Sequence, residues 1–281
     1  MHPANIEALR TAHVAYASLA NNHTLDFCEE GLLETVRTLK RAAISFAGAG
    51  ETREEATRPA VLSLPSHSGQ GSGQPSYALH IYSASDHPRD WTTVANFHLI
   101  DYSAATRAHL KSLLTEQGEL PSPALKVFSV HWGPNYSWQP SNEIQSLAHF
   151  LVDECAVDVV HGHSSHHVQG VERYRGKLII YGCGDFVDDY AVKQDYRNDL
   201  GATWRVTVRE GKSNIDDGRE RLSLHTLEVF PTRIKHFQAN LLDVRDADHA
   251  WVRDKVTQLS GALGTPVQEE LGDQGQLIVA L

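Results

Sequence analysis

Near its start, the chain alternates between strand and helix patterns in a way that limits the folds open to it. Residues 14–19 have the pattern of a buried strand, and residues 29–43 carry an apolar stripe at helical spacing. Residues 44–47 return to a strand pattern that stops at Gly48-Ala49-Gly50. This order predicts a βαβ unit, with two parallel strands in one sheet and a helix on its face. We therefore expect an α/β fold.

Similar patterns continue along the chain. We expect further strands at 60–64, 77–83, 124–130, 157–160 and 178–181, and further helices at 3–11, 106–114 and 142–154. Beyond residue 200 we expect strands at 203–208, 223–229 and 233–238, then a helix at 247–263 and a strand at 276–281. The Ser- and Gly-rich residues 66–76 predict a flexible surface loop inside one domain. We divide the chain into a domain over residues 1–240 and a C-terminal helix-and-strand extension over residues 241–281.

Composition and charge exclude several classes of protein. A chain of 281 residues with 41% hydrophobic and 21% charged residues is typical of a globular protein. Its net charge of −10 argues against a nucleic-acid partner, because the chain would repel phosphate backbones. The three cysteines cannot form an even disulfide framework. The sequence contains no apolar run of membrane-span length and no signal-peptide pattern at its start. We expect a cytoplasmic protein.

Three polar clusters follow predicted strands. They are Asn21-Asn22-His23, His131-Trp132-Gly133 and the run from His161 to His167, which holds four histidines in seven residues. Side chains beyond the carboxyl ends of strands converge in α/β folds, and imidazole is a preferred ligand of transition metals. The clusters therefore predict a metal site. The alternative is a polar surface loop that happens to be rich in histidine.

The residues next to these histidines suggest roles in catalysis and binding. Asn22 can supply an oxygen ligand, while His23 could stay unligated and act as a general acid. Asp26 could orient His23 or could cap the helix that follows. We assign substrate contacts to Asn21, to Trp132 and to Asp185, although Trp132 is equally suited to a packing role.

Several segments of the sequence resemble the CapA family of capsule and poly-γ-glutamate synthesis proteins. The segments are 18–26, 31–35, 47–50, 131–133, 162–174, 176–181 and 184–186. Their order matches that of the family, and the resemblance covers residues 1–190. It implies a calcineurin-like metallophosphoesterase fold, a four-layer α/β/β/α sandwich around a site for two divalent ions of Mn, Fe or Zn.

The resemblance also implies roles for single residues. Asn22, His131, His163 and His166 would be metal ligands, and His23 would be the catalytic acid. Two metals would activate water and stabilise the charge that develops on the attacked group. The substrate would be a small molecule or an anionic polymer.

Three features depart from the family pattern. The Gly-Asp strand and the Asn-Leu-Glu segment that usually open the domain do not precede Asn22, so we expect an N-terminally incomplete sandwich. A motif that often reads His-Pro-His is Ser164-Ser165-His166 here, and position 185, commonly Asn, is Asp185. The latter two departures leave open which histidine is the ligand.

The sequence is compatible with three functions. The first is a metal-dependent hydrolase that acts on a phosphoester or on an amide of a polyglutamate-type polymer. The second is a non-catalytic binding or assembly component with an incomplete metal site. The third is a metallo-β-lactamase-type hydrolase, for which the spacing of His161, His163 and His166 fits but Ser165 stands where an Asp is required. That family gives no reason for Asn22-His23, so we favour the first two.

Overall fold

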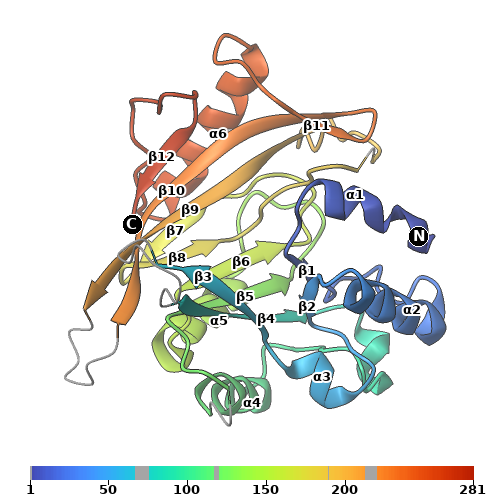
Figure 1. The fold of residues 1–281 in the computed structure, drawn as a ribbon. Helices are drawn as coiled ribbons and strands as arrows, with labels where there is room; N and C mark the ends of the chain where they lie inside the picture. The colour runs from blue at the N-terminus through green and yellow to red at the C-terminus, as the bar shows by residue number, and fades with distance from the viewer. Residues whose placement is uncertain (1, 67–75, 117–119, 189, 213–219) are drawn as a thin grey trace. The chain divides into compact units, whose positions relative to one another are not determined.

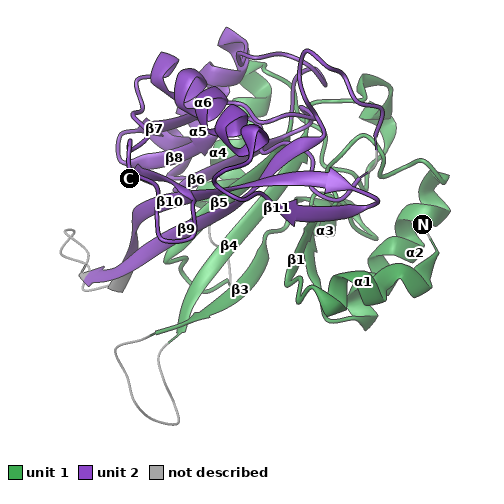
Figure 2. Cartoon of the chain, turned by 90° about the horizontal axis from the view of Figure 1, so that it is seen from above, with its two compact units in different colours: residues 1–131 green, residues 132–281 purple. Residues whose placement is uncertain are grey.

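The computed structural model describes the chain except residues 1, 67–75, 117–119, 189 and 213–219. The predicted loop at 66–76 therefore lies almost wholly outside the described residues. The chain forms two compact units, residues 1–131 and residues 132–281 (Figure 2). Both contain helices and sheet strands, so the predicted α/β class is confirmed.

Unit 1 begins with the predicted βαβ arrangement. A short 3-10 turn η1 (Pro3–Asn5) and helix α1 (Ile6–Thr11) lead into strand β1 (Tyr16–Ser18). Helix α2 (Cys28–Arg41) then connects β1 to the parallel strand β2 (Ser45–Ala47).

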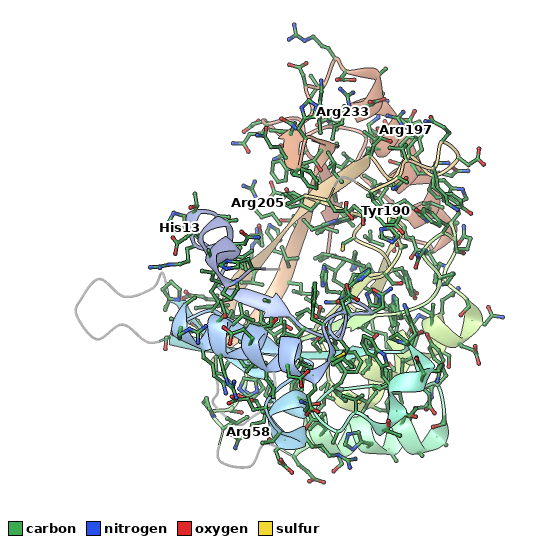
Figure 3. The ribbon with its side chains drawn as sticks, turned by 90° about the vertical axis from the view of Figure 1, so that its right-hand side faces the viewer. His13, Arg58, Tyr190, Arg197, Arg205 and Arg233 are labelled. Carbon is green, nitrogen blue, oxygen red and sulfur yellow. The ribbon has the colours of Figure 1, made fainter. Side chains whose placement is uncertain are left out.

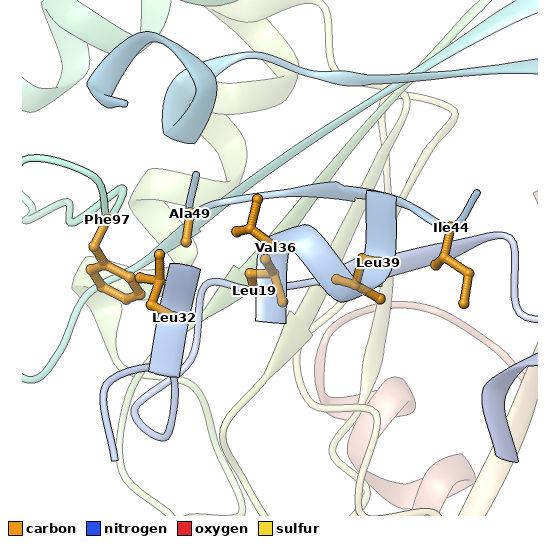
Figure 4. Close-up of a cluster of buried hydrophobic side chains, with 7 residues drawn as sticks. All are labelled: Leu19, Leu32, Val36, Leu39, Ile44, Ala49 and Phe97. Carbon is orange, nitrogen blue, oxygen red and sulfur yellow. The ribbon is translucent and has the colours of Figure 1, made fainter. Parts of the chain in front are cut away.

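The apolar face of α2 forms the core of this part of unit 1. Leu32, Val36 and Leu39 are buried in one cluster with Leu19, Ile44, Ala49 and Phe97 (Figure 4). Full burial of one such side chain contributes about 1.5–3 kcal/mol to stability. Because these residues recur at helical spacing, they lie on one face of α2, and this face packs against Leu19 in the loop after β1.

The remaining elements of unit 1 are the strands of a second sheet and the helices next to them in the sequence. They are helix α3 (Arg53–Thr57), strands β3 (Ala60–Pro65) and β4 (Ser76–Ser85), turn η2 (Arg89–Thr93), helix α4 (Ala104–Thr115) and strand β5 (Leu125–His131). Strand β4 pairs antiparallel with β3 and parallel with β5, which sets Ser85 opposite His131. The Ser103 hydroxyl caps α4 by accepting a hydrogen bond from the Thr106 backbone.

Unit 2 begins with helix α5 (Asn142–Cys155), which the Ser141 hydroxyl caps, and strand β6 (Val159–His163). Strands β7 (Val171–Tyr174) and β8 (Lys177–Ile180) form a hairpin, and β8 lies parallel to β6. The hairpin turns at Arg175-Gly176, where both residues have positive φ angles.

The rest of unit 2 is a second sheet centred on one long strand (Figure 1). Strand β10 (Glu220–Lys235) pairs antiparallel with β9 (Leu200–Lys212), β11 (Gln238–Leu241) and β12 (Leu277–Ala280). Helix α6 (Ala247–Ala262) packs on β10, β9 and β7. No described helix is long and apolar enough to span a membrane.

Several predicted strand boundaries are wrong, and two of them change the place of polar residues. The strand expected at 157–160 is β6, which runs from Val159 to His163, so two histidines expected in a loop belong to the strand. The strand expected at 233–238 is the end of β10, and the chain turns at His236-Phe237, where positive φ angles break the ladder before β11.

Candidate functional site

The sequence-predicted site residues divide between the two units. Asn21, Asn22, His23, Asp26 and His131 belong to unit 1. Trp132, His163, His166 and Asp185 belong to unit 2. Each set is therefore described within its own unit.

In unit 1, the residues after β1 form a polar turn. The His23 backbone N–H donates to Asn21 Oδ1 at 2.9 Å, and Asn22 is half-buried in the same turn. His23 Nδ1 lies 2.9 Å from Asp26 Oδ2. The N-cap position of α2 is Phe27, which has no side-chain cap, so Asp26 contacts His23 instead of capping the helix. The His23 side chain is 68% exposed, which leaves Nε2 accessible to solvent.

His131 is the last residue of β5 and is buried. Its ring lies 4.6 Å from the ring of His87, centroid to centroid. Asp86, also buried, pairs with His87 Nδ1 and accepts a hydrogen bond from the Tyr102 hydroxyl at 2.6 Å. Sequence reasoning missed Asp86 and His87. Both residues directly follow strand β4, which is the same pattern that marked the other polar clusters. They were missed because β4 was expected to end at residue 83, two residues before its actual end.

In unit 2, His161 and His163 lie on one face of β6, because side chains alternate along a strand. Their ring centroids are 5.6 Å apart. Burial lowers the pKa of His161 to about 4, so that imidazole is neutral at physiological pH. Neutral imidazole is the form that ligates metals.

Gly162 separates these histidines for a steric reason. A Cβ atom at this position would lie 2.3 Å from the Tyr181 carbonyl oxygen and 2.6 Å from Trp132 Nε1. The Trp132 indole N–H donates to that same Tyr181 oxygen at 2.9 Å, passing beside the bare backbone. Trp132 is buried and stacks on Tyr181, so the structure places it in the packing of unit 2.

His166 and Asp185 form the most constrained pair of unit 2. His166 Nδ1 lies 3.0 Å from both carboxylate oxygens of Asp185. The ring is stacked between Tyr190, at 4.6 Å, and Tyr136, at 5.7 Å. The hydrogen bond that His166 donates to Asp185 raises the pKa of His166, and burial raises the pKa of Asp185. One ligand atom each of His166, Asp185 and Asp188 lie within 4.8 Å of one another.

These side chains fit a transition metal ion. A metal-ligating histidine commonly donates its second ring N–H to a carboxylate, which fixes the tautomer and directs the other nitrogen at the ion. The His166–Asp185 pair has this form, with Nδ1 held by the carboxylate and Nε2 left for a ligand bond. Imidazole and carboxylate donors together suit Zn, Mn or Fe.

A comparison of the sequence with known families agrees with this set of motifs. Residues 1–190 match the model of the family described as "Bacterial capsule synthesis protein PGA_cap". The chain belongs to this family. The resemblance to capsule synthesis proteins of the CapA type is thereby confirmed over the residues expected from the motifs.

Individual relatives include proteins named for polyglutamine synthesis and for capsule biosynthesis. The chain is 32% identical over 283 residues to the "Probable polyglutamine synthesis accessory protein" of Mycobacterium tuberculosis, covering 95% of this chain and 67% of the relative. It is 25% identical over 185 residues to the "Capsule biosynthesis protein CapA" of Bacillus anthracis, covering 66% of this chain and 42% of the relative. Among solved structures, it is similar to a hypothetical protein from Thermus thermophilus, with a TM-score of 0.45 and 16% identity over 82% of each chain.

Proposed function

We propose that this PGA_cap protein is a metal-dependent hydrolase that acts on an anionic polymer of the polyglutamate type or on a phosphoester. The observation that supports it best is the half-buried pair of His166 and Asp185, which has the arrangement of a metal ligand and its supporting carboxylate. The names of the relatives, which concern capsule and polyglutamine synthesis, favour the polymer as substrate.

Each unit has candidate metal ligands of its own. In unit 2, His163 and His166 would hold a divalent ion, and in unit 1 the family resemblance assigns the same role to Asn22 and His131. A divalent ion there would act as a Lewis acid and make water a stronger nucleophile.

His23 would supply a proton to the leaving group. Its Nδ1 is held by Asp26, so the exposed Nε2 is the atom that gives up the proton. The Asn21 side chain accepts the His23 backbone N–H and so fixes the turn that carries the ring. A positioned general acid of this kind accelerates a reaction by about 10²–10⁴-fold.

The test starts from the purified full chain. Its transition-metal content is measured, and hydrolysis of a γ-linked glutamate oligomer is compared with that of p-nitrophenyl phosphate. We expect bound Zn, Mn or Fe, and loss of the metal and of hydrolysis in His166→Ala. The matched control is His149→Ala, because His149 pairs with Glu172 at 3.0 Å in the same unit. A protein that holds no transition metal and is unaffected by His131→Ala contradicts the proposal.

A second function, non-catalytic binding or assembly, is favoured by one finding. The Mycobacterium tuberculosis relative is called an accessory protein. A chain of this kind would bind the glutamate oligomer without hydrolysing either substrate, whether or not metal is supplied.

A further inference from the structure

Beside His166, unit 2 contains a group of packed aromatic rings to which the hydrolase proposal gives no role. This aromatic cluster consists of Tyr136, Trp138, His167, Tyr196 and Trp251. Trp138 lies 4.6 Å from His167, 5.0 Å from Tyr196 and 6.2 Å from Trp251, between ring centroids. The rings come from the segment after β5, the segment after β6, the segment before β9 and helix α6.

Hydrogen bonds fix the segments that carry these rings. The Ser137 backbone N–H donates to His167 Nε2 at 3.2 Å, and the Gln169 amide donates to the Ser137 carbonyl at 2.6 Å. His167 Nδ1 donates in turn to the Val168 carbonyl at 3.1 Å. The rings of Tyr136 and Trp138, which flank Ser137, are therefore held in place before any ligand arrives.

Two lysines lie over the faces of the aromatic cluster. Lys193 Nζ is 4.4 Å from the ring centroid of Tyr136. Lys255 Nζ, on α6, is 4.3 Å from the centroid of Trp138 and 5.6 Å from that of Trp251. A cation over an aromatic face is attracted by the ring, which confines the end of an otherwise flexible side chain.

The backbone of Lys193 is fixed as well. Its N–H donates at 2.7 Å to Oδ1 of Asn198, a buried residue whose amide also donates to the Ala191 carbonyl. Both ammonium groups are thus positioned by contacts that do not neutralise them.

Other cations of unit 2 differ from these lysines. Arg197 and Arg233 are labelled in Figure 3. Arg197 bonds to Asp199 and Asp248, and Arg233 bonds to Asp246 and Asp248, so both guanidinium groups are already neutralised. Among the residues that the structure describes, neither Lys193 nor Lys255 pairs with a carboxylate. In a chain with a net charge of −10, these two lysines offer positive charge that a ligand can use.

The aromatic cluster adjoins the candidate metal ligand. Tyr136 contacts Lys193 on one side and stacks on His166, and His166 is bonded to Asp185. In space, the acidic pair Asp185 and Asp188 is next to His166, His166 is next to Tyr136, and Tyr136 is next to Lys193. An anionic ligand that approaches His166 would be repelled by the carboxylates and attracted by the lysines.

We propose that Lys193 and Lys255 form a subsite for the carboxylates of an anionic peptide polymer next to His166. The proposal rests on the function proposed above. It names the part of unit 2 that would bind the substrate at a point distant from the bond that is hydrolysed. Two ammonium groups on separate elements suit a ligand with repeated carboxylates better than a single small anion.

The experiment is a calorimetric titration of the full chain with a γ-linked glutamate decamer. The double variant Lys193→Gln/Lys255→Gln is compared with Lys235→Gln, an exposed lysine of β10. We expect the double variant to weaken binding by about tenfold or more at low salt, with a smaller dependence of Kd on salt. The control variant should bind within about twofold of the original chain, because it lacks contact with the subsite. Double replacement by Arg should restore binding, because the charge returns.

Four outcomes would overturn the proposal. The first three are unchanged binding in the double variant, equal loss in Lys235→Gln, and equal binding of a neutral γ-linked glutamine decamer. Tighter binding of polyphosphate than of the glutamate decamer would also overturn it, because the subsite would then select phosphates. The titration is carried out with a metal chelator present, so that the decamer is not hydrolysed during the measurement. Lysine-dependent binding without hydrolysis would retain the subsite and reject the hydrolase, whereas hydrolysis with lysine-independent binding would do the reverse.

Discussion

Two of the histidine–aspartate pairs, one taken from each unit, have the same chemistry and nearly the same length. His23 and Asp26 are 2.9 Å apart in unit 1, and His166 and Asp185 are 3.0 Å apart in unit 2. Their surroundings differ. The side chains of the first pair are 68% and 50% exposed, whereas those of the second are 18% and 13% exposed, with the ring between two tyrosines.

This difference suits the pairs to different tasks. An exposed pair of this kind contributes only about 0–1 kcal/mol, so little holds the His23 ring against Asp26 and the ring can turn toward a substrate. A half-buried imidazole held by a carboxylate and two rings keeps one orientation, as a metal ligand must. We therefore propose that the exposed pair donates a proton and that the half-buried pair supports a metal ligand.

The largest effect that separates the two tasks is expected in His23→Ala. Without a general acid, the hydrolysis rate should fall by about 10²–10⁴-fold. The metal content should not change, because His23 would give a proton rather than bind the ion. Rate and metal content are measured on the same preparation, with His149→Ala as the control. A loss of metal in His23→Ala would show that the two histidines do not differ in the way proposed.

A third histidine tests what burial does without a carboxylate. His98 is buried in unit 1, and its Nδ1 lies 2.7 Å from the Ser83 carbonyl oxygen. Burial lowers its pKa from 6.5 to about 4. Between these values the unfolded chain binds a proton that the folded chain does not, so the free energy of unfolding should fall as the pH drops through this range. Full protonation of His98 would cost the folded state about 3 kcal/mol, and this cost is absent at pH 7, where the ring is neutral in both states.

The measurement is chemical unfolding at several pH values in the range from 6.5 to 4. The variant His98→Gln keeps a donor for the Ser83 carbonyl but cannot titrate. The variant can be more or less stable than the original chain, because only the slope of the free energy of unfolding against pH is compared. A slope as steep as that of the original chain would mean that His98 is protonated in the folded state.

The next effect concerns Asp185. Replacement by Ala removes the group that holds His166 Nδ1, so the affinity for Zn²⁺ should fall by about 10–100-fold. Replacement by Asn keeps an oxygen that accepts the same hydrogen bond and should cost less than Ala. Zn²⁺ titration of both variants measures this order, with Asp26→Ala as the control from the exposed pair. If Ala and Asn cost the same, the charge of Asp185 matters rather than its hydrogen bond.

The smallest effect is expected at the exposed pair itself. Asp26→Asn should change the free energy of unfolding at pH 7 by less than about 1 kcal/mol, because solvent already screens the interaction with His23. Thermal or urea unfolding measures it. A loss of several kcal/mol would show that the turn after β1 depends on this contact for its fold.

The local patterns of the sequence predicted the fold best where burial repeats at a fixed spacing. The stripe of Leu32, Val36 and Leu39 marked α2 within a few residues of its ends. The same reasoning ended β6 too early, because polar histidines were taken as the start of a loop although they continue the strand with Gly162 between them. The short strands β7 and β11 carry few buried side chains, so no periodicity marked them.

The candidate site was predictable as a set of residues but not as a set of contacts. Strand ends pointed to His23, His131, His163 and His166. The pairing of His166 with Asp185 spans the β7–β8 hairpin, whose register the sequence does not contain. The contact of Lys255 with Trp138 joins α6 to a segment more than a hundred residues away and depends on tertiary packing alone.

The bare backbone at Gly162 has a genetic consequence. The Trp132 indole reaches the Tyr181 carbonyl only because nothing projects from β6 at that position. A single base change converts a glycine codon into an alanine codon, and the added methyl group would push on the indole and on the strand that carries His161 and His163. A random mutagenesis screen for loss of function should therefore recover codon 162, although its residue touches no substrate and titrates no proton.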